Sequence, residues 1–341
     1  MHCEWLVSTI PEQLERASST RNEVFLSPDL VVRVNRHPNQ RLRREALLCR
    51  HLPDAPWAPD VLAYGGEVGA DYLIVRRRPG APLSRWWPDL SSNMRRDAVR
   101  QLCTALAVLH ETQTPVHIPR IDNSPHLIDP RNVTPLVPLL LAIEELTPID
   151  PGLFADVLDY VHHTADALSE YSQRTLIHGD LSFENLLWNG AELTGILDFE
   201  WCRGAPLDLE LDVLFRFCAF PHAHVAPDYE ARTLAADYVD VPVWVAEDRP
   251  DLFEHPALFE RLMLYAISFS VQELISHPLA PNTPRAILGP MHPICRLANL
   301  LHHGGHLTAT LQRIGLRSDL TGRRSAHRDK TACPVAPAFE R

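Results

Sequence analysis

The chain has 341 residues, a length suited to two lobes or domains with substantial cores. Its 32 Lys+Arg residues against 43 Asp+Glu give a net charge of -11, and no basic patch is visible. This balance argues against a nucleic acid or an anionic membrane surface as partner, and it fits a cationic small molecule. Acidity also keeps many soluble proteins in solution, so the charge alone does not identify a ligand.

The cysteines and the two ends of the chain lead to further expectations. Seven cysteines are scattered without a Cys-x-x-Cys pair, which indicates a reduced, cytoplasmic protein with neither a disulfide framework nor a zinc site. Residues 1–10 lack a signal peptide's basic start and apolar core, and the apolar run 136–143 is too short to span a bilayer. Residues 318–341 are polar and irregular, so they predict a disordered tail. We therefore expect no membrane partner, and the oligomeric state is not indicated.

The N-terminal part of the chain predicts an antiparallel sheet with one long helix. Residues 12–17 favour a short helix, whereas 18–26 and 30–34 alternate as two strands joined by Ser-Pro-Asp. Apolar residues recur at helical spacing over 41–52. Two further strands, 61–64 and 72–75, are separated by glycine turns and complete a sheet that we expect to have five strands.

The central part of the chain predicts helices on either side of a loop. Residues 95–110 carry apolar side chains at helical spacing and indicate an amphipathic helix packed in the core. Residues 112–134 are rich in proline and polar groups, and we expect a long connecting loop. Two more helices are predicted over 137–146 and 154–168.

Three short strands then surround the polar residues that stand out most. Residues 175–177, 185–188 and 193–197 are apolar and strand-like, and Asn189-Gly190 is a turn signal between the second and the third. The resulting hairpin brings Asn185 and Asp198 to the same end. Their amide and carboxylate oxygens are ligands that a hard divalent cation prefers. Asp180, on the preceding loop, is then free to receive a proton from an incoming hydroxyl.

This arrangement is the one that phosphoryl transfer requires. The transition state spreads charge over the phosphate oxygens, so a metal must neutralise it and a carboxylate must orient the nucleophile. The pattern His-Gly-Asp-Leu-x-x-x-Asn from His178 to Asn185, followed by Asp-Phe-Glu at Asp198, resembles the aminoglycoside phosphotransferase family. The resemblance covers roughly residues 18–275 and is most specific over 176–201.

The resemblance implies an α+β, bilobal protein-kinase-like fold. Residues 1–78 are expected to form a small lobe with an antiparallel sheet and one helix that covers the nucleotide. Residues 79–317 are expected to form a larger, mostly helical lobe with the catalytic loop, the metal site and the acceptor pocket. By resemblance Asp180 is the catalytic base, and Asn185 and Asp198 are the ligands of Mg²⁺.

The resemblance also assigns a set of nucleotide-binding residues in the small lobe. Ser19, Thr20 and Asn22 fall in the phosphate-covering loop, although the family's usual glycine is missing there. Arg33 stands where the family carries a phosphate-binding lysine, and a guanidinium can grip phosphate through two hydrogen bonds. Glu45 would be the ion-pair partner of Arg33. The alternative is that Glu45 pairs with neighbouring arginines, Arg41 or Arg44, on a solvated helix face.

The hinge between the lobes is the other part of the nucleotide site. Residues 75–78 fall at this hinge, where backbone groups are expected to bind the purine edge. We assign Val75, Arg76 and Leu187 to this contact. The run Pro-Gly-Ala-Pro-Leu over 79–83 resembles the family's segment after the hinge.

The C-terminal part offers candidates for structural and acceptor-binding acids. Either Asp208 or Asp212 stands for the family's structural aspartate, or both line the acceptor pocket with Glu210. Residues 228–240 and 255–276 predict helices, and related enzymes build their acceptor pockets from helices in this region. The carboxylates available there to hold a cationic substrate are Glu230, Asp237, Asp240, Glu260 and Glu273.

The sequence therefore predicts a cytoplasmic small-molecule kinase that uses Mg²⁺ and ATP or GTP. The expected acceptor is a hydroxyl of an amine-bearing compound, such as an aminoglycoside or another antibiotic. Two alternatives stay open: a metabolic kinase of the homoserine or choline type, and a catalytically silent relative that binds nucleotide and regulates a partner. The intact Asp180, Asn185 and Asp198 oppose the silent relative, because a binding module has no need for a base.

Overall fold

The computed structural model describes residues 10, 13–17, 22–115, 117–119, 121, 133, 136–146, 151–169, 175–280, 283 and 287–316. The chain divides into two compact units. Unit 1 comprises residues 1–123, 174–204 and 222–233, and unit 2 comprises residues 124–173, 205–221 and 234–341. The expected phosphate-covering loop at Ser19 and Thr20, most of the 112–134 connection, and the tail 318–341 lie outside the described residues.

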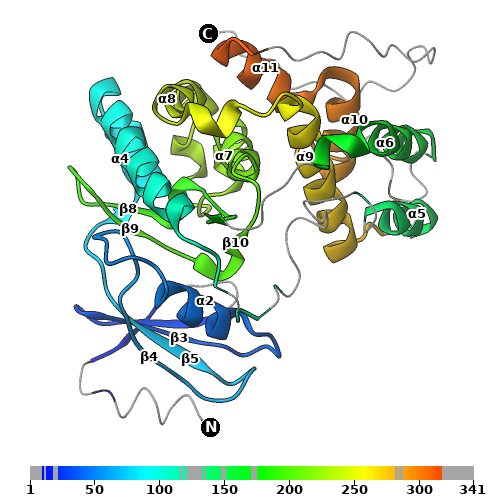
Figure 1. Cartoon of the computed structure of the whole chain (residues 1–341). Coiled ribbons are helices and arrows are strands. Elements are labelled where there is room, and N and C mark those ends of the chain that lie inside the picture. The colour runs from blue at the N-terminus through cyan, green and yellow to red at the C-terminus, as the bar shows by residue number, and fades with distance from the viewer. Residues whose placement is uncertain are drawn as a thin grey trace. The chain divides into compact units, whose positions relative to one another are not determined.

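Unit 1 begins with the expected five-stranded antiparallel sheet (Figure 1). Its strands lie in the order β1-β2-β3-β5-β4, and their bounds are Glu15–Ala17, Glu23–Leu26, Leu30–Val34, Tyr72–Arg76 and Val61–Gly65, in that same order. The helix predicted over 12–17 is wrong, because Glu15–Ala17 pairs with β2 as the edge strand. A pairing partner in the folded chain has outweighed the local helical preference of Glu-Arg-Ala.

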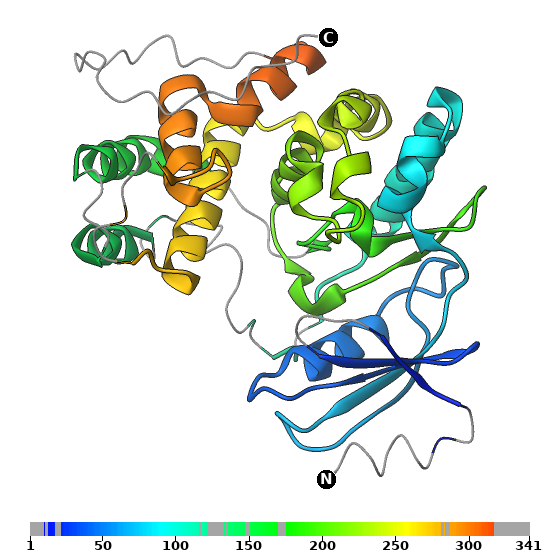
Figure 2. The ribbon, with the colours of Figure 1, turned by 180° about the vertical axis from the view of Figure 1, so that it is seen from behind.

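The two faces of this sheet carry different side chains because neighbouring residues in a strand point to opposite faces. Leu73 of β5 packs on one face against Leu42 and Ala46 of helix α2 (Arg41–Cys49). Val32 and Val34 of β3 belong to a separate cluster with Phe25, Tyr72 and Ile74. Helix α2 therefore covers the Leu73 face of the sheet, as Figures 1 and 2 show from opposite sides.

The rest of unit 1 consists of short strands and helices around one hairpin. The helices are α3 (Leu83–Trp86) and α4 (Ser92–Glu111), and the strands are β6 (Ala81–Pro82), β7 (Leu176–Ile177), β8 (Leu186–Trp188), β9 (Leu193–Ile196) and β10 (Arg203–Gly204). Strands β6, β8 and β9 form one small sheet, and β7 pairs with β10. At the β8–β9 turn, Asn189 Oδ1 accepts from the N–H groups of Ala191 and Glu192 at 3.0 and 2.9 Å. Gly190 has a φ of 104°, a value that favours glycine. The predicted Asn-Gly hairpin is thus present.

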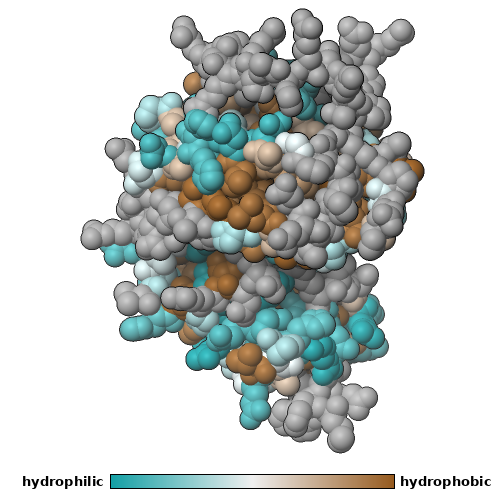
Figure 3. All heavy atoms as spheres, turned by 90° about the vertical axis from the view of Figure 1, so that its right-hand side faces the viewer, coloured by the Kyte–Doolittle hydropathy of each residue, from teal (hydrophilic) through white to brown (hydrophobic). Residues whose placement is uncertain are grey.

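Unit 2 is helical among its described residues. Its helices are α5 (Leu136–Leu146), α6 (Pro151–Thr164), α7 (Leu209–Ala219), α8 (Val241–Asp248), α9 (Leu258–Ser276), α10 (Pro293–His303) and α11 (Gly305–Ile314). The helix predicted over 228–240 is wrong: Glu230–Arg232 of unit 1 and Ala235–Tyr238 of unit 2 form two 3₁₀ turns, and α8 begins at Val241. Apolar side chains such as Leu141 and Ile275 stay exposed, and Figure 3 shows apolar surface gathered on one face. Among the described residues, no helix combines the length and apolar character that a membrane span requires.

Candidate active site

The first component of the site is an ion pair between the sheet and helix α2. Arg33 is the register partner of Leu73, so its side chain lies on the sheet face that α2 covers. Its Nη1 donates to Oε1 and Oε2 of Glu45 at 2.6 and 2.5 Å. The side chains are 17% and 5% exposed, respectively. The ion pair that the resemblance implied is therefore present, and Glu45 does not lie on a solvated face.

Charges crowd around this pair. Burial raises the pKa of Glu45 to about 7, with help from the carboxylates of Asp198 and Glu200, while Arg33 opposes the shift. Burial alone would lower the pKa of Arg33, but the three carboxylates outweigh it and raise the pKa above its ordinary value. Arg33 thus stays charged, and it is shared among several acids.

The turn that carries Asp180 is fixed by its two preceding residues. The N–H of Asp180 donates to Nδ1 of His178 at 3.3 Å, and Nε2 of His178 lies 2.8 Å from the carbonyl oxygen of Leu197. Since Nδ1 accepts, Nε2 carries the proton and donates to Leu197. Gly179 has a φ of 78°, and a Cβ on it would lie 2.7 Å from the carbonyl oxygen of Trp201. Glycine is required here both for the backbone angle and for the close approach.

The hairpin brings Asn185 and Asp198 together, as its register predicts. The N–H of Leu197 donates to the carbonyl oxygen of Asn185 at 2.8 Å. The side-chain Nδ2 of Asn185 donates to the carbonyl oxygen of Asp180 at 2.8 Å and to its Oδ2 at 3.2 Å. Asp198 Oδ1 accepts from Arg33 Nη2 at 3.3 Å. These contacts join the carboxylates of Asp180 and Asp198, the amide of Asn185 and the guanidinium of Arg33 into one connected group in unit 1.

The donor set at this end of the hairpin suits a magnesium ion. The amide nitrogen of Asn185 points at Asp180, which leaves its Oδ1 for another partner, and Asp198 is 34% exposed. Oxygen ligands in small number fit Mg²⁺, because this ion keeps several waters and binds substrate phosphates. Within the described ranges no group of three or more His, Cys, Asp or Glu side chains could hold a metal. Asn185 and Asp198 are the candidate ligands at this end of the hairpin, and their assignment stays a prediction.

Asp198 also has an unusual backbone. It is the one non-glycine residue with positive φ in the described part of the chain, at φ 62° and ψ 60°. This left-handed conformation costs free energy in residues other than glycine, and it often occurs at functional sites. It turns the chain from strand β9 into the 3₁₀ turn Phe199–Trp201.

Helix α2 holds this turn through two arginines. Arg41 Nη1 donates to Oε1 of Glu200 at 3.2 Å, and its guanidinium lies 4.7 Å from the ring centroid of Trp201. Arg44 is 5% exposed and donates to three backbone carbonyls: that of Glu200 at 3.2 Å, and those of Cys202 and Pro119. Sequence reasoning missed both contacts, since it considered these arginines only as partners for Glu45.

The assignment of Val75, Arg76 and Leu187 to the purine stays a prediction, and the backbone contacts of this segment bear on it. The N–H of Arg76 already donates to the carbonyl oxygen of Asp60 at 2.9 Å, and the N–H of Arg77 donates to that of Asp29 at 2.7 Å. The N–H of Arg78 has no such bond among the described residues, which makes it the better candidate donor to a base. A Cβ on Gly195 would lie 3.2 Å from Leu187 Cδ1 and 3.5 Å from Arg78 Cβ. Leu187 and the Arg78 side chain therefore converge beside Gly195.

The remaining small-lobe candidates contribute less. Val75 lies in β5, paired with Val31 and Val61. Asn22 is partly buried and directly precedes β2. Ser19 and Thr20 lie outside the described residues, so their assignment stays a prediction.

In unit 2 both candidate structural aspartates are paired with arginines. Asp208 binds the Nε and Nη2 of Arg261, the latter at 3.0 Å, and accepts from the hydroxyl of Tyr265 at 3.4 Å. Asp212 Oδ2 accepts from Arg216 Nη1 at 2.7 Å. Each of these buried carboxylates has an arginine partner, which offsets part of the cost of its burial.

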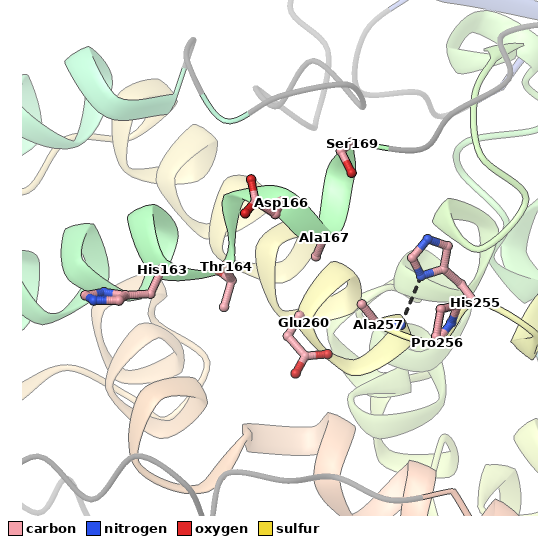
Figure 4. A pocket seen from close by; sticks show the side chains of 9 residues that line it. All are labelled: His163, Thr164, Asp166, Ala167, Ser169, His255, Pro256, Ala257 and Glu260. Carbon is pink, nitrogen blue, oxygen red and sulfur yellow. Dashed lines mark hydrogen bonds between the residues drawn. The ribbon is translucent and has the colours of Figure 1, made fainter.

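A cavity of about 390 Å³ lies within unit 2 (Figure 4). It is lined by the end of α6, the 3₁₀ turn after it and the start of α9. Asp166 and Glu260 contribute carboxylates, and His255 accepts from the N–H of Ala257 at 3.1 Å. Of the carboxylates proposed from sequence to hold a cation, Glu260 is the one that lines this cavity.

Comparisons with known proteins bear on the fold and the family of the chain. No curated protein sequence matches the chain significantly. Among solved structures, aminoglycoside phosphotransferase APH(2'')-Ib bound to ADP is 18% identical, with coverage of 91% of this chain and 98% of that one and a TM-score of 0.58. A thermostable mutant of APH(4)-Ia with AMP-PNP and hygromycin B is 16% identical, with 80% and 91% coverage and a TM-score of 0.56. The streptomycin–ATP complex of APH(2'')-IIa is 18% identical, with 80% and 89% coverage and a TM-score of 0.54.

At these identities the solved structures establish the fold, which is the predicted bilobal kinase-like α+β class. The family assignment rests on a different finding. The model of the phosphotransferase enzyme family matches residues 13–246, which is more than half of the chain. The chain therefore belongs to the phosphotransferase enzyme family and is a phosphotransferase that acts on hydroxyl groups.

Proposed function

We propose that this phosphotransferase moves the terminal phosphate of ATP or GTP to a hydroxyl of a small, amine-bearing acceptor, such as an aminoglycoside or another antibiotic. The observation that carries the proposal is the connected group in unit 1. In this group the side chain of Asn185 donates to Asp180, and the N–H of Leu197 donates to the carbonyl oxygen of Asn185. The guanidinium of Arg33 donates to the carboxylate of Asp198. Solved relatives of this fold hold ATP, ADP or AMP-PNP, and several hold an aminoglycoside.

Each side chain has a defined task in this proposal. Asp180, oriented by Asn185, accepts a hydrogen bond from the acceptor hydroxyl and takes its proton as the new P–O bond forms. Arg33 binds phosphate oxygens, and its pairing with Glu45 fixes the direction of the guanidinium. Positioning and charge neutralisation supply most of the rate enhancement.

Asn185 and Asp198 are the residues that would hold Mg²⁺, which supplies positive charge against the phosphate oxygens when it is bound. The Arg33–Asp198 contact of 3.3 Å keeps this carboxylate close to the phosphate-binding guanidinium.

The choice of an amine-bearing acceptor is supported by charge. The chain carries a net charge of -11, and a cavity of unit 2 presents Asp166 and Glu260. Ammonium groups would find counter-charges there, whereas an anionic acceptor would be repelled.

The test is phosphate transfer from labelled ATP and GTP to a panel of aminoglycosides, other antibiotics and small amino alcohols. Asp180→Asn keeps the shape of the side chain but removes the base, so we expect kcat to fall by about 10²–10⁴. Asp97→Asn is the matched control, because Asp97 is a solvent-facing acid of α4 that pairs with Arg100. Chelation of Mg²⁺ should abolish transfer by the parent protein.

Label that moves to one class of acceptor, and only with Asp180 intact, supports the proposal and names the substrate. Transfer to homoserine or choline in place of antibiotics would favour a metabolic kinase. Nucleotide binding without transfer to any acceptor would favour the silent regulator, and no nucleotide binding at all would refute the proposal.

A further inference from the structure

Arg44 is a buried, charged side chain to which the reaction scheme above gives no task. It lies on helix α2 next to Glu45, and its guanidinium donates to backbone carbonyls. Its Nε donates to the carbonyl oxygen of Glu200 and its Nη2 to that of Cys202. Its Nη1 donates to the carbonyl oxygen of Pro119. One guanidinium therefore joins three segments of unit 1 that are far apart in the sequence.

These contacts lie immediately beyond the metal-binding aspartate. Glu200 and Cys202 follow Asp198 by two and four residues, and the left-handed backbone of Asp198 leads directly into their turn. Such a conformation persists only where the surrounding structure fixes it. Hydrogen bonds from a charged donor are about twice as strong as neutral ones, and buried carbonyls left without donors are costly.

Arg41 adds a second contact on the same turn. It binds the carboxylate of Glu200 and stacks on Trp201, but it is more exposed than Arg44. Since α2 also carries Glu45, the partner of Arg33, one helix sets the place of both the phosphate-binding guanidinium and the metal-binding turn.

We infer that Arg44 is a positioning residue for the metal site: it holds the turn after Asp198 so that this carboxylate keeps its ion-binding place. The inference rests on the proposed function, in which Asp198 binds Mg²⁺. In that scheme Arg44 is given no contact with substrate or metal, and it acts through the backbone of residues 200–202. A lysine could serve one or two of the three carbonyls, so it is an incomplete substitute.

The experiment compares Arg44→Met and Arg44→Lys with the parent and with Arg43→Met. Arg43 is the matched control because it is the neighbouring arginine on the same helix and is exposed. Two quantities are measured below the melting transition of every variant. They are the hydrogen-exchange rates of the amides of residues 197–203, and the affinity for Mn²⁺ by electron paramagnetic resonance in the presence of ADP or GDP.

In Arg44→Met we expect faster exchange over 197–203 and at least a tenfold weaker affinity for Mn²⁺, with affinity for metal-free nucleotide within threefold of the parent. Arg44→Lys should fall between, and Arg43→Met should match the parent. Unchanged exchange, or Mn²⁺ affinity within twofold of the parent in folded Arg44→Met, would overturn the inference. A parent that binds no Mn²⁺ with nucleotide would overturn the proposed function, and the inference with it.

Discussion

Removal of the Arg33 guanidinium, as in Arg33→Met, should destabilise the protein through Glu45. The variant leaves a carboxylate with a side chain only 5% exposed beside the carboxylates of Asp198 and Glu200. Removal of one partner from a buried pair typically costs about 3–5 kcal/mol. Because Glu45 can take up a proton, the cost depends on pH.

The direction of that dependence follows from the pKa. In the parent, burial raises the pKa of Glu45 from 4.5 to about 7 even beside Arg33, and without Arg33 it must rise further. A carboxyl with a raised pKa contributes stability that is fully present below pH 4.5 and is lost as the pH rises through its folded pKa. As the pH rises above about 7, Glu45 of the parent becomes ionised and the parent loses no further stability through this group. Glu45 of the variant has a higher pKa, so the variant continues to lose stability. The gap between them should therefore widen by about 1.4 kcal/mol for each pH unit above 7.

Urea denaturation at pH 6 and pH 8.5 measures this gap as a difference in the free energy of unfolding. Arg33→Met/Glu45→Gln is the informative control, since it removes the buried charge along with its partner. We expect it to regain most of the lost stability and to show a gap that does not change with pH. A pH-independent gap for Arg33→Met, or a double variant no more stable than the single one, would refute this reasoning.

Two further predictions concern unit 2. The ring of His306 packs edge-on against that of Phe220, with 5.6 Å between the ring centroids, and its buried Nε2 has no partner among the described residues. Burial lowers the pKa of His306 to about 4. Arg216 and Arg296 add to this shift, and Asp212 opposes it. Between pH 6.5 and 4 the imidazole is protonated in the unfolded chain but not in the folded chain, so the free energy of unfolding should fall by up to about 3 kcal/mol. In His306→Gln the free energy of unfolding should depend less on pH over this range. Equal pH dependence in the parent and the variant would contradict the assignment. For Glu260→Gln we expect an aminoglycoside to bind at least threefold more weakly by calorimetry, with the exposed Glu247→Gln unchanged; equal affinities would exclude Glu260 from the binding site.

The sheet and the hairpin of unit 1 were predictable because their signals are local. Period-two alternation marks β3 and β5, and Asn189-Gly190 fixes the turn that sets Asn185 opposite Leu197. The ion pair of Arg33 with Glu45 also follows once strand and helix are placed, since register determines the face on which Arg33 lies.

The features that sequence reasoning missed depend on partners distant in the chain. Strand β1 has three residues of ordinary helical preference, and its pairing with β2 decides its conformation. Residues 228–240 form 3₁₀ turns where propensity favours a continuous helix. Arg44 binds backbone carbonyls, which every residue type presents, so no sequence pattern reveals these contacts.

The left-handed backbone of Asp198 has a consequence for engineering. A residue forced into this region costs of order 1–3 kcal/mol, a cost that glycine largely avoids. Selection for heat resistance alone would therefore favour small, flexible replacements at Asp198, although they remove the carboxylate that the reaction is proposed to need. Screens for stability and screens for catalysis should diverge most at this residue, and a library of thermostable variants should hold it fixed.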